Sequence, residues 1–252
     1  MLRPVTDSRD VARLVAPNPG PMTLEGTNTY VVGRDPAVVI DPGPADRGHI
    51  EAIRAEADGR GGIGFVLLTH SHADHAEGVE MLGVEPTPIG DADEVQGLRA
   101  MDTPGHSRDH VCFIHPVSVV SAAGLVDVFA GDLILGEGST IVPPAAQGGS
   151  LAGYMDSLRK LQALKIELIY PGHGPVITDP AAKIAEYVAH REEREARLIA
   201  ALESGERSRV ALLNRVWDDV PADLRAAAAY AMQAHVEKLV AEGKLREEEL
   251  SE

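Results

Sequence analysis

Six consecutive residues concentrate side chains that bind metal ions. The segment His70–His75 holds three imidazoles and one carboxylate and directly follows an apolar run. Imidazole nitrogens and carboxylate oxygens are ligands that suit zinc. Alternation along an extended segment lets His70 and His72 point the same way. Asp74 and His75, at the start of a following helix, can then point to a neighbouring position, so the pattern predicts two adjacent metal ions.

Three more candidate ligands stand at glycine-containing turns. His106 lies in TPGHS, Asp132 in AGD and His173 in YPGHG. A single histidine beside a turn is usually a surface or hydrogen-bonded residue, but here the same context recurs. We therefore expect one metal centre built from His70, His72, Asp74, His75, His106, Asp132 and His173.

The elements that must position these residues follow a layered pattern. From Val11 to about Thr178, short β-type runs alternate with turns and helical stretches, as in an α/β domain. The expected strands are residues 29–33, 37–41, 65–69, 110–114, 127–132 and 167–172. The expected helices are residues 46–58 and, after a Ser150 cap, 151–164. Four of these strands end with, or are followed by, Gly, His or Asp. Reactive side chains are therefore expected together at strand C-termini, where open α/β sheets place their functional sites.

The last third of the chain has a different composition. Beyond residue 180 it is rich in Ala, Arg, Glu and Leu with helical periodicity. Helices are expected over residues 180–202, 209–217 and 224–242. We therefore predict a first domain over residues 1–179 and a C-terminal helical, winged-helix-like module over residues 180–252. A helical cap that only packs on the core is the alternative.

The motifs HSHADH, TPGHS, AGD and YPGHG together resemble the metallo-β-lactamase superfamily. This resemblance implies a four-layer αββα sandwich with two metals at one edge. It further implies a first zinc held by His70, His72 and His106, a second held by Asp74, His75 and His173, and Asp132 as the bridge. Asp41, in VIDPG, matches the upstream Asp of that family and would orient the ligands from behind.

A longer similarity concerns one branch of that family. The segment NPGPMTLEGTNTY (residues 18–30) and the helical tail are similar to the β-lactamase-like protein 2 group, over nearly the whole chain. Asn28, in this segment, is a candidate to support the ligands or contact substrate. The group includes single-stranded RNA endonucleases, while many bacterial relatives carry general hydrolase labels inherited from glyoxalase II. The resemblance thus implies single-stranded RNA or a small ester or thioester as substrate.

The chemistry expected of such a centre is hydrolysis by a metal-bridging hydroxide. A water shared by two metal ions about 3.5 to 4 Å apart loses a proton near neutral pH and becomes the nucleophile. Asp132 would be the central catalytic carboxylate because it fixes the metal spacing. His110, four residues after His106, is the second catalytic candidate, as a group that touches substrate or supports a ligand. We expect two zinc ions, with iron or manganese as alternatives.

The reaction class leaves the substrate open. Whole-chain resemblance favours RNA, whereas the formal net charge of -16 favours a small molecule, because an acidic surface repels polyanions. The alternative is a glyoxalase II-like hydrolase of a small thioester, ester or lactone, although the tail has no evident basic cluster to grip glutathione. A single-iron oxygenase of the same fold and a nucleic-acid-binding regulator with a relict site are further alternatives.

Composition also bears on location. Apolar runs stay well short of the roughly 20 residues that cross a bilayer, and the start MLRPVTDSRD has no apolar signal-peptide region. We therefore expect a cytoplasmic protein that does not bind membranes. The single cysteine, Cys112, cannot form an intramolecular disulfide, which fits a reducing compartment. The oligomeric state stays open.

Overall fold

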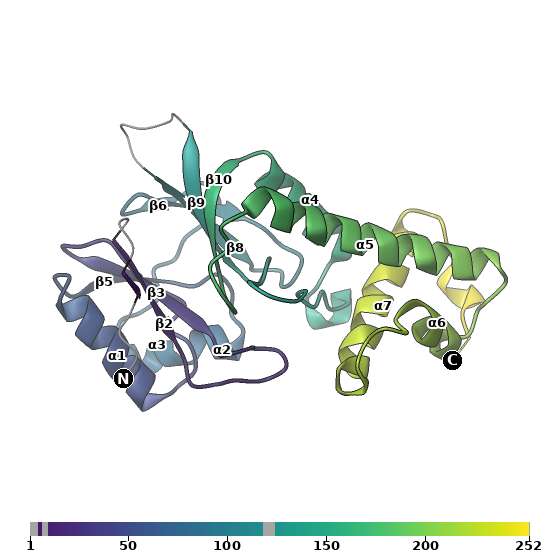
Figure 1. Ribbon diagram of the computed structural model, residues 1–252, viewed down its shortest axis with the longest axis horizontal. Coiled ribbons are helices and arrows are strands. Elements are labelled where there is room, and N and C mark those ends of the chain that lie inside the picture. Colours follow the sequence, from purple (N-terminus) through teal and green to yellow (C-terminus); the bar gives the residue numbers. More distant parts are fainter. Residues whose placement is uncertain (1–4, 7–9, 118–123, 252) are drawn as a thin grey trace.

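Two β-sheets packed face to face form the body of the protein (Figure 1). The computed structural model describes residues 5–6, 10–117 and 124–251. Within these ranges the strand orders are β1-β2-β3-β4-β5 and β10-β9-β8-β7-β6. The first sheet contains β1 (Val5–Thr6), β2 (Val11–Val15), β3 (Asn28–Val32), β4 (Ala37–Ile40) and β5 (Ile63–Leu67). The second contains β6 (Glu94–Val95), β7 (Leu98–Asp102), β8 (Val111–Pro116), β9 (Leu125–Gly131) and β10 (Lys165–Pro171).

Helices flank both sheets and continue into the tail. Those beside the first sheet are α1 (Arg47–Asp58), α2 (Ala73–Ala76) and α3 (Gly78–Leu82). The later ones are α4 (Leu151–Gln162), α5 (Pro180–Glu203), α6 (Arg209–Val216) and α7 (Arg225–Ala241). Single 3-10 turns are η1 (Ala145–Gln147), η2 (Ala222–Leu224) and η3 (Glu247–Glu249).

Successive side chains of β3 and β4 point alternately into two different apolar cores. Tyr30 and Ile40 face the second sheet and belong to the apolar core between the sheets. Val31 and Val39, one residue away on each strand, face outwards and pack against Ile53 of α1. Because successive strand residues point to opposite faces, such continuous apolar runs suit strands that are covered on both sides.

The outer face of the second sheet is covered by α4 and the first half of α5. Tyr154 and Leu158 of α4 and Tyr187 of α5 pack against Val128 and Ile169. The order of layers is therefore α1, first sheet, second sheet, then α4 with α5. The predicted four-layer αββα sandwich is confirmed.

The C-terminal tail is helical, as predicted, and is tied to the sandwich by one long helix. Ile184, near the start of α5, lies in the sandwich core, whereas Leu198 packs with Leu212 and Trp217 in the tail core. In Figure 1, α7 lies between the sandwich and α6. The division expected after residue 179 thus falls at the start of a helix that contributes to both cores.

The ends of the expected elements lie within two residues of those observed, but two full strands escaped the sequence analysis. These are β2 and β7. In β7 only Leu98 and Ala100 are fully buried, and Arg99 and Asp102 are exposed. Short, half-polar strands give a weak periodic signal because their stability comes from neighbouring strands.

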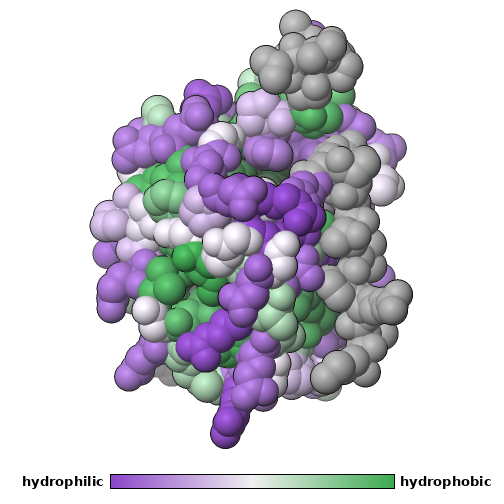
Figure 2. Space-filling view, turned by 90° about the vertical axis from the view of Figure 1, so that its left-hand side faces the viewer, coloured by the Kyte–Doolittle hydropathy of each residue, from purple (hydrophilic) through white to green (hydrophobic). Residues whose placement is uncertain are grey.

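No helix in the described ranges is long and apolar enough to cross a membrane. Figure 2 looks at the left-hand end of Figure 1 and shows hydrophilic residues around a smaller hydrophobic area. The sandwich forms this end, and the helical tail lies on the opposite side.

Candidate metal centre

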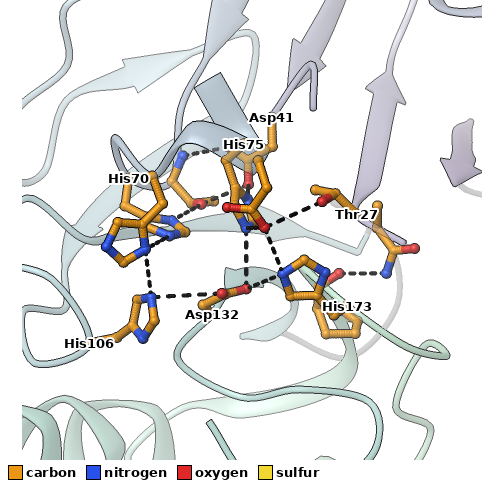
Figure 3. Close-up of polar contacts among 12 residues, drawn as sticks. Thr27, Asp41, His70, His75, His106, Asp132 and His173 are labelled. Atoms are coloured by element: carbon orange, nitrogen blue, oxygen red, sulfur yellow. Dashed lines mark hydrogen bonds and ion pairs between the residues drawn. The ribbon is translucent and has the colours of Figure 1, made fainter. Parts of the chain in front are cut away.

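The carboxyl ends of two parallel strand pairs supply the candidate centre. Strands β4 and β5 run parallel in one sheet, and β9 and β10 run parallel in the other. Asp41 follows β4 and His70 lies just beyond β5, while Asp132 follows β9 and His173 lies beyond β10. Figure 3 shows these side chains converging between the two sheets. The four strand ends therefore bring together residues that are far apart in sequence.

A glycine lets two of these loops approach closely. A Cβ atom on Gly172 would overlap Oδ1 of Asp132 and would lie 2.7 Å from Cε1 of His75. Both approaches are shorter than van der Waals contact. The YPGHG motif therefore needs its first glycine so that Asp132 and His75 can meet.

His70, His72 and His106 form the first group of converging nitrogens. Nε2 of His70 lies 2.9 Å from Nδ1 of His72, and Nε2 of His106 also lies 2.9 Å from that Nδ1. One ion could take one nitrogen from each ring. The fold thus brings together the three residues that the resemblance assigned to the first metal.

Asp74, His75 and His173 form the second group. Oδ2 of Asp74 lies 3.2 Å from Nε2 of His173 and 3.5 Å from Nε2 of His75. Asp74 and His75 lie on α2, and His173 follows β10. These three residues also offer one ligand atom each to a common point.

Asp132 spans the two groups (Figure 3). Its Oδ1 lies 3.4 Å from Nε2 of His75 and 3.4 Å from Nε2 of His173. Its Oδ2 lies 3.7 Å from Nε2 of His106. One oxygen is thus directed at the second group and the other at the first, which is the placement of a bridging carboxylate.

Asp41 and Thr69 orient two of the imidazoles from behind. Thr69 donates to Asp41 through its backbone N–H and its hydroxyl, at 2.7 Å each. The hydroxyl of Thr69 can then accept from Nδ1 of His70 at 3.0 Å, and Asp41 accepts from Nδ1 of His75 at 2.9 Å. Because Nδ1 is the donor in both rings, their Nε2 atoms stay available to the centre.

Backbone carbonyls orient two other imidazoles. Nδ1 of His106 donates to the carbonyl of Ile141 at 2.8 Å, and Nδ1 of His173 donates to that of Gly26 at 3.3 Å. Metal-binding histidines typically use the outer nitrogen in this way, which fixes the tautomer. In the neutral form of each ring, the inward Nε2 of His106 and of His173 is then the atom that can bind a cation.

Electrostatics at the centre favours a bound cation. Burial alone would raise the pKa of the Asp132 carboxyl, but His75 and His173 hold it well below its usual value. Burial and the charge of His75 lower the pKa of His70, so His70 is neutral. Burial alone would lower the pKa of His173, yet Asp132 and Asp74 raise it to about 9. A site that attracts a proton so strongly also attracts a metal cation.

The residues present fit a metal. The buried atoms Nε2 of His75 and Oδ1 of Asp132 are 3.4 Å apart, and neither makes a well-formed hydrogen bond within the described residues. Buried polar atoms without hydrogen bonds call for another partner. Carboxylates and imidazoles arranged in this way are ligands that zinc accepts, each in its deprotonated form.

His110 and Asn28 lie next to the candidate ligands but outside the two groups. His110 is only 1% exposed; its ring lies 5.3 Å from that of His70, and its Nδ1 pairs with the Thr103 hydroxyl at 2.9 Å. Burial lowers its pKa to about 3, so it is neutral. Asn28 donates to the carbonyls of Pro171 and Gly174 at 2.8 and 2.9 Å. Asn28 therefore fastens the loop that carries His173.

Sequence reasoning missed two polar residues that support Asp74. The hydroxyl of Thr27 lies 3.4 Å from Oδ2 of Asp74 and accepts from Nδ2 of Asn18 at 3.0 Å. Asn18 also accepts from the backbone N–H of Thr27 through its Oδ1 at 2.9 Å. Both residues belong to the 18–30 segment, which the sequence analysis singled out only for Asn28.

A cavity of about 520 Å³ opens beside the centre and reaches the tail. His106 and Asp132 line its inner side, and Trp217 and Ala231 of the tail line its far side. We call it the junction cavity. It was not foreseen from the sequence, because it depends on how α5 and α7 pack against the sandwich.

Comparison with known proteins agrees with this geometry. Residues 22–85 and 89–173 match the model of the family described as "Metallo-beta-lactamase superfamily". The chain belongs to the metallo-β-lactamase superfamily. Residues 210–251 match a second model, described as "Beta-lactamase associated winged helix domain". The resemblance inferred from the motifs and the winged-helix character of the tail are thereby confirmed.

Several metallo-β-lactamase relatives resemble the chain over most of its length. A β-lactamase-like protein 2 homolog of Caenorhabditis elegans is 34% identical over 92% of this chain and 85% of its own. The Drosophila melanogaster homolog of the same name is 31% identical over 94% and 89%. An atrochrysone carboxyl ACP thioesterase of Aspergillus fumigatus is 33% identical over 85% and 75%. Among solved structures, the metallo-β-lactamase family protein TTHA1429 of Thermus thermophilus has a TM-score of 0.70, with 23% identity over 93% and 94%.

Proposed function

We propose that the protein is a dinuclear metallo-hydrolase that cleaves a compact ester or thioester. The observation that carries this proposal is the position of Asp132, whose two oxygens face two separate ligand groups. We propose two zinc ions as the native metals, with iron or manganese as alternatives. The complete second group supports two ions per chain.

The ligand residues define the chemistry. Two divalent ions bound here would supply Lewis acidity and a nucleophilic water at neutral pH. Asp132 sets the distance between the two sites and stays ionised at neutral pH. Asp41 orients His70 and His75 through Thr69 and a direct hydrogen bond. We assign His110 a positioning role behind His70, because its ring is buried and does not line the junction cavity.

The junction cavity supports a small substrate over single-stranded RNA. Single-stranded nucleic acids bind in grooves with free basic side chains and exposed aromatic rings. Here Arg194 of α5 is bound to Asp219 at 2.6 Å, and Trp217 is only 4% exposed. The net charge of -16 adds long-range repulsion of a polyanion. A thioester is favoured because one relative, similar over most of both chains, carries a thioesterase name.

The test is a parallel assay of hydroxyacyl and acyl thioesters beside a labelled single-stranded oligonucleotide. We expect thioester turnover by the zinc-loaded wild type and none by His70→Ala. Asp132→Asn should also inactivate, while Asp156→Asn, on the exposed face of α4, should not. RNA cleavage that depends on His70, with intact thioesters, would reject the proposed substrate and establish the nuclease alternative.

A further inference from the structure

The junction cavity has two chemically different sides. The inner side carries His106 and Asp132 of the candidate metal centre. The far side is formed by Trp217, Val220, Leu224 and the alanines of α7. A volume of about 520 Å³ falls within the usual range for small-molecule sites. A ligand that reaches the metals therefore also meets an apolar wall.

Two arginines near this wall each hold a backbone carbonyl. Arg194 donates to the carbonyl of Val216 at 2.5 Å and to Asp219 at 2.6 Å. Arg191 donates through Nη2 to the carbonyl of Thr140. Burial and the neighbouring Arg191 lower the pKa of His190, so it is neutral. A free carboxylate or phosphate would have to compete with these contacts, whereas an uncharged apolar group would not.

The alanine run of α7 explains why the cavity is open. Ala231 lies four residues after Ala227 and three after Ala228, so it shares a face of the helix with both, and all three line the cavity. Ala228 and Ala231 also belong to the tail core, but Ala227 is only half-buried. Larger side chains on this face would extend into the cavity. The small side chains of Ala227, Ala228 and Ala231 thus leave space beside the candidate metal centre.

The sandwich loop before β3 adds apolar groups to the cavity, beside the exposed Glu137 and Ser139. Met22 and Leu24, from the loop before β3, line it on the sandwich side. Met22 is 52% exposed, so it stands at the solvent end of the cavity. The backbone N–H of Leu24 donates to the carbonyl of Gly20 at 2.8 Å and holds this loop in a turn. Apolar side chains of this loop thus line the same cavity as His106.

We propose that the junction cavity binds the acyl chain of the substrate, with the scissile carbonyl at the metal centre and the chain directed towards α7. Ala227 and Ala231 then set the longest chain that fits. This inference rests on the proposed hydrolase function, because it names the substrate class of the same site. The substrate is an ester or thioester whose acyl chain is aliphatic and carries no charged group. The leaving group remains at the solvent side.

The test uses thioesters of one thiol with acyl groups from acetyl to dodecanoyl. For wild type we expect kcat/KM to rise roughly three- to fourfold with each added methylene until the cavity is full. Ala227→Leu and Ala231→Leu should lose turnover of the longest substrates by about tenfold or more and keep turnover of the acetyl thioester. Ala226→Leu, exposed on the same helix, is the matched control and should keep the wild-type profile. Ala227→Leu is the safer variant because that position is outside the tail core.

Binding separates this inference from the proposed reaction. Alkyl thioethers, in which a methylene replaces the carbonyl, cannot be hydrolysed, and their affinity can be measured by calorimetry. The acyl site is supported if affinity rises with chain length in wild type but stops rising at a shorter chain in Ala227→Leu. This holds even if no thioester turns over and the hydrolase proposal fails. Chain-length profiles identical in wild type, Ala227→Leu and Ala231→Leu would overturn it. So would a wild-type kcat/KM that does not change with acyl length.

Discussion

Arg191 of α5 donates a hydrogen bond to the backbone carbonyl of Thr140, one residue before Ile141. The carbonyl of Ile141 in turn accepts from Nδ1 of His106. A helix that continues into the C-terminal module therefore holds the loop that orients a candidate metal ligand. The guanidinium also lies 5.2 Å from the centre of the Tyr154 ring, which fixes its direction. The tail thus supports the group of His70, His72 and His106 and also lines the junction cavity.

Arg191→Met should weaken zinc binding at the group of His70, His72 and His106. Loss of outer contacts to metal ligands typically costs about 10- to 100-fold in affinity. Titration against a chromophoric zinc chelator measures this, with Arg197→Met, on the same helix but bound to Asp218, as the control. Equal zinc affinity in both variants would show that loop 139–141 is held without Arg191.

Asp132→Ala should cost more activity than His110→Ala. Asp132 faces both ligand groups, so its loss weakens both sites, and we expect a decrease of about a hundredfold or more. His110 acts behind His70, and its loss should cost about tenfold by the same scale. Elemental analysis should find close to two zinc ions in wild type and fewer in Asp132→Ala. A reversed order of activities at equal metal content would contradict these roles.

The ligands could be predicted from sequence because their chemistry is rare and concentrated. Three imidazoles within His70–His75 are hard to explain otherwise, and the turns at His106, Asp132 and His173 repeat one context. The role of Arg191 could not be predicted. Its partner is a backbone carbonyl 51 residues away, and every residue of the chain offers the same kind of acceptor.

Composition marks where the C-terminal tail begins but not which core its helices pack into. The shift at residue 180 correctly marks the start of α5, and truncation there is the deletion that the sequence suggests. Yet Ile184 and Tyr187 of α5 and Ala234 of α7 belong to the sandwich core. Removing them would expose apolar surface of the second sheet. Helical periodicity identifies the buried face of α5 but does not say which core buries it.

His49 should make the protein sensitive to mild acid. Its Nε2 donates to the hydroxyl of Thr29 at 2.8 Å, and Thr29 donates to the carbonyl of Asp41 at 2.6 Å. Burial lowers the pKa of His49 to about 4, although the nearby carboxylate of Asp46 opposes this shift. The folded state therefore binds its proton less readily than the unfolded state does. This contribution to stability is complete above the unfolded pKa of 6.5 and is lost as pH falls towards 4.

Urea unfolding of wild type and His49→Gln between pH 7 and pH 4 measures this contribution. Glutamine can still donate to Thr29 but does not titrate. We expect the wild type to lose about 2 to 3 kcal/mol more than the variant over this range. Parallel pH profiles for the two proteins would place the acid sensitivity elsewhere.

Gly172→Ala should disrupt the metal centre although glycine carries no ligand. The added Cβ would overlap Oδ1 of Asp132 and lie 2.7 Å from the ring of His75, so one of them must move. Both atoms belong to groups that are fixed from several sides, and His75 is held by Asp41 at 2.9 Å. We expect zinc content to fall below two per chain and activity to drop by about a hundredfold or more. Gly59→Ala is the matched control, because a Cβ there would meet its nearest neighbour at an ordinary 3.5 Å. Full zinc occupancy in Gly172→Ala would mean that the loops can separate without loss of the site.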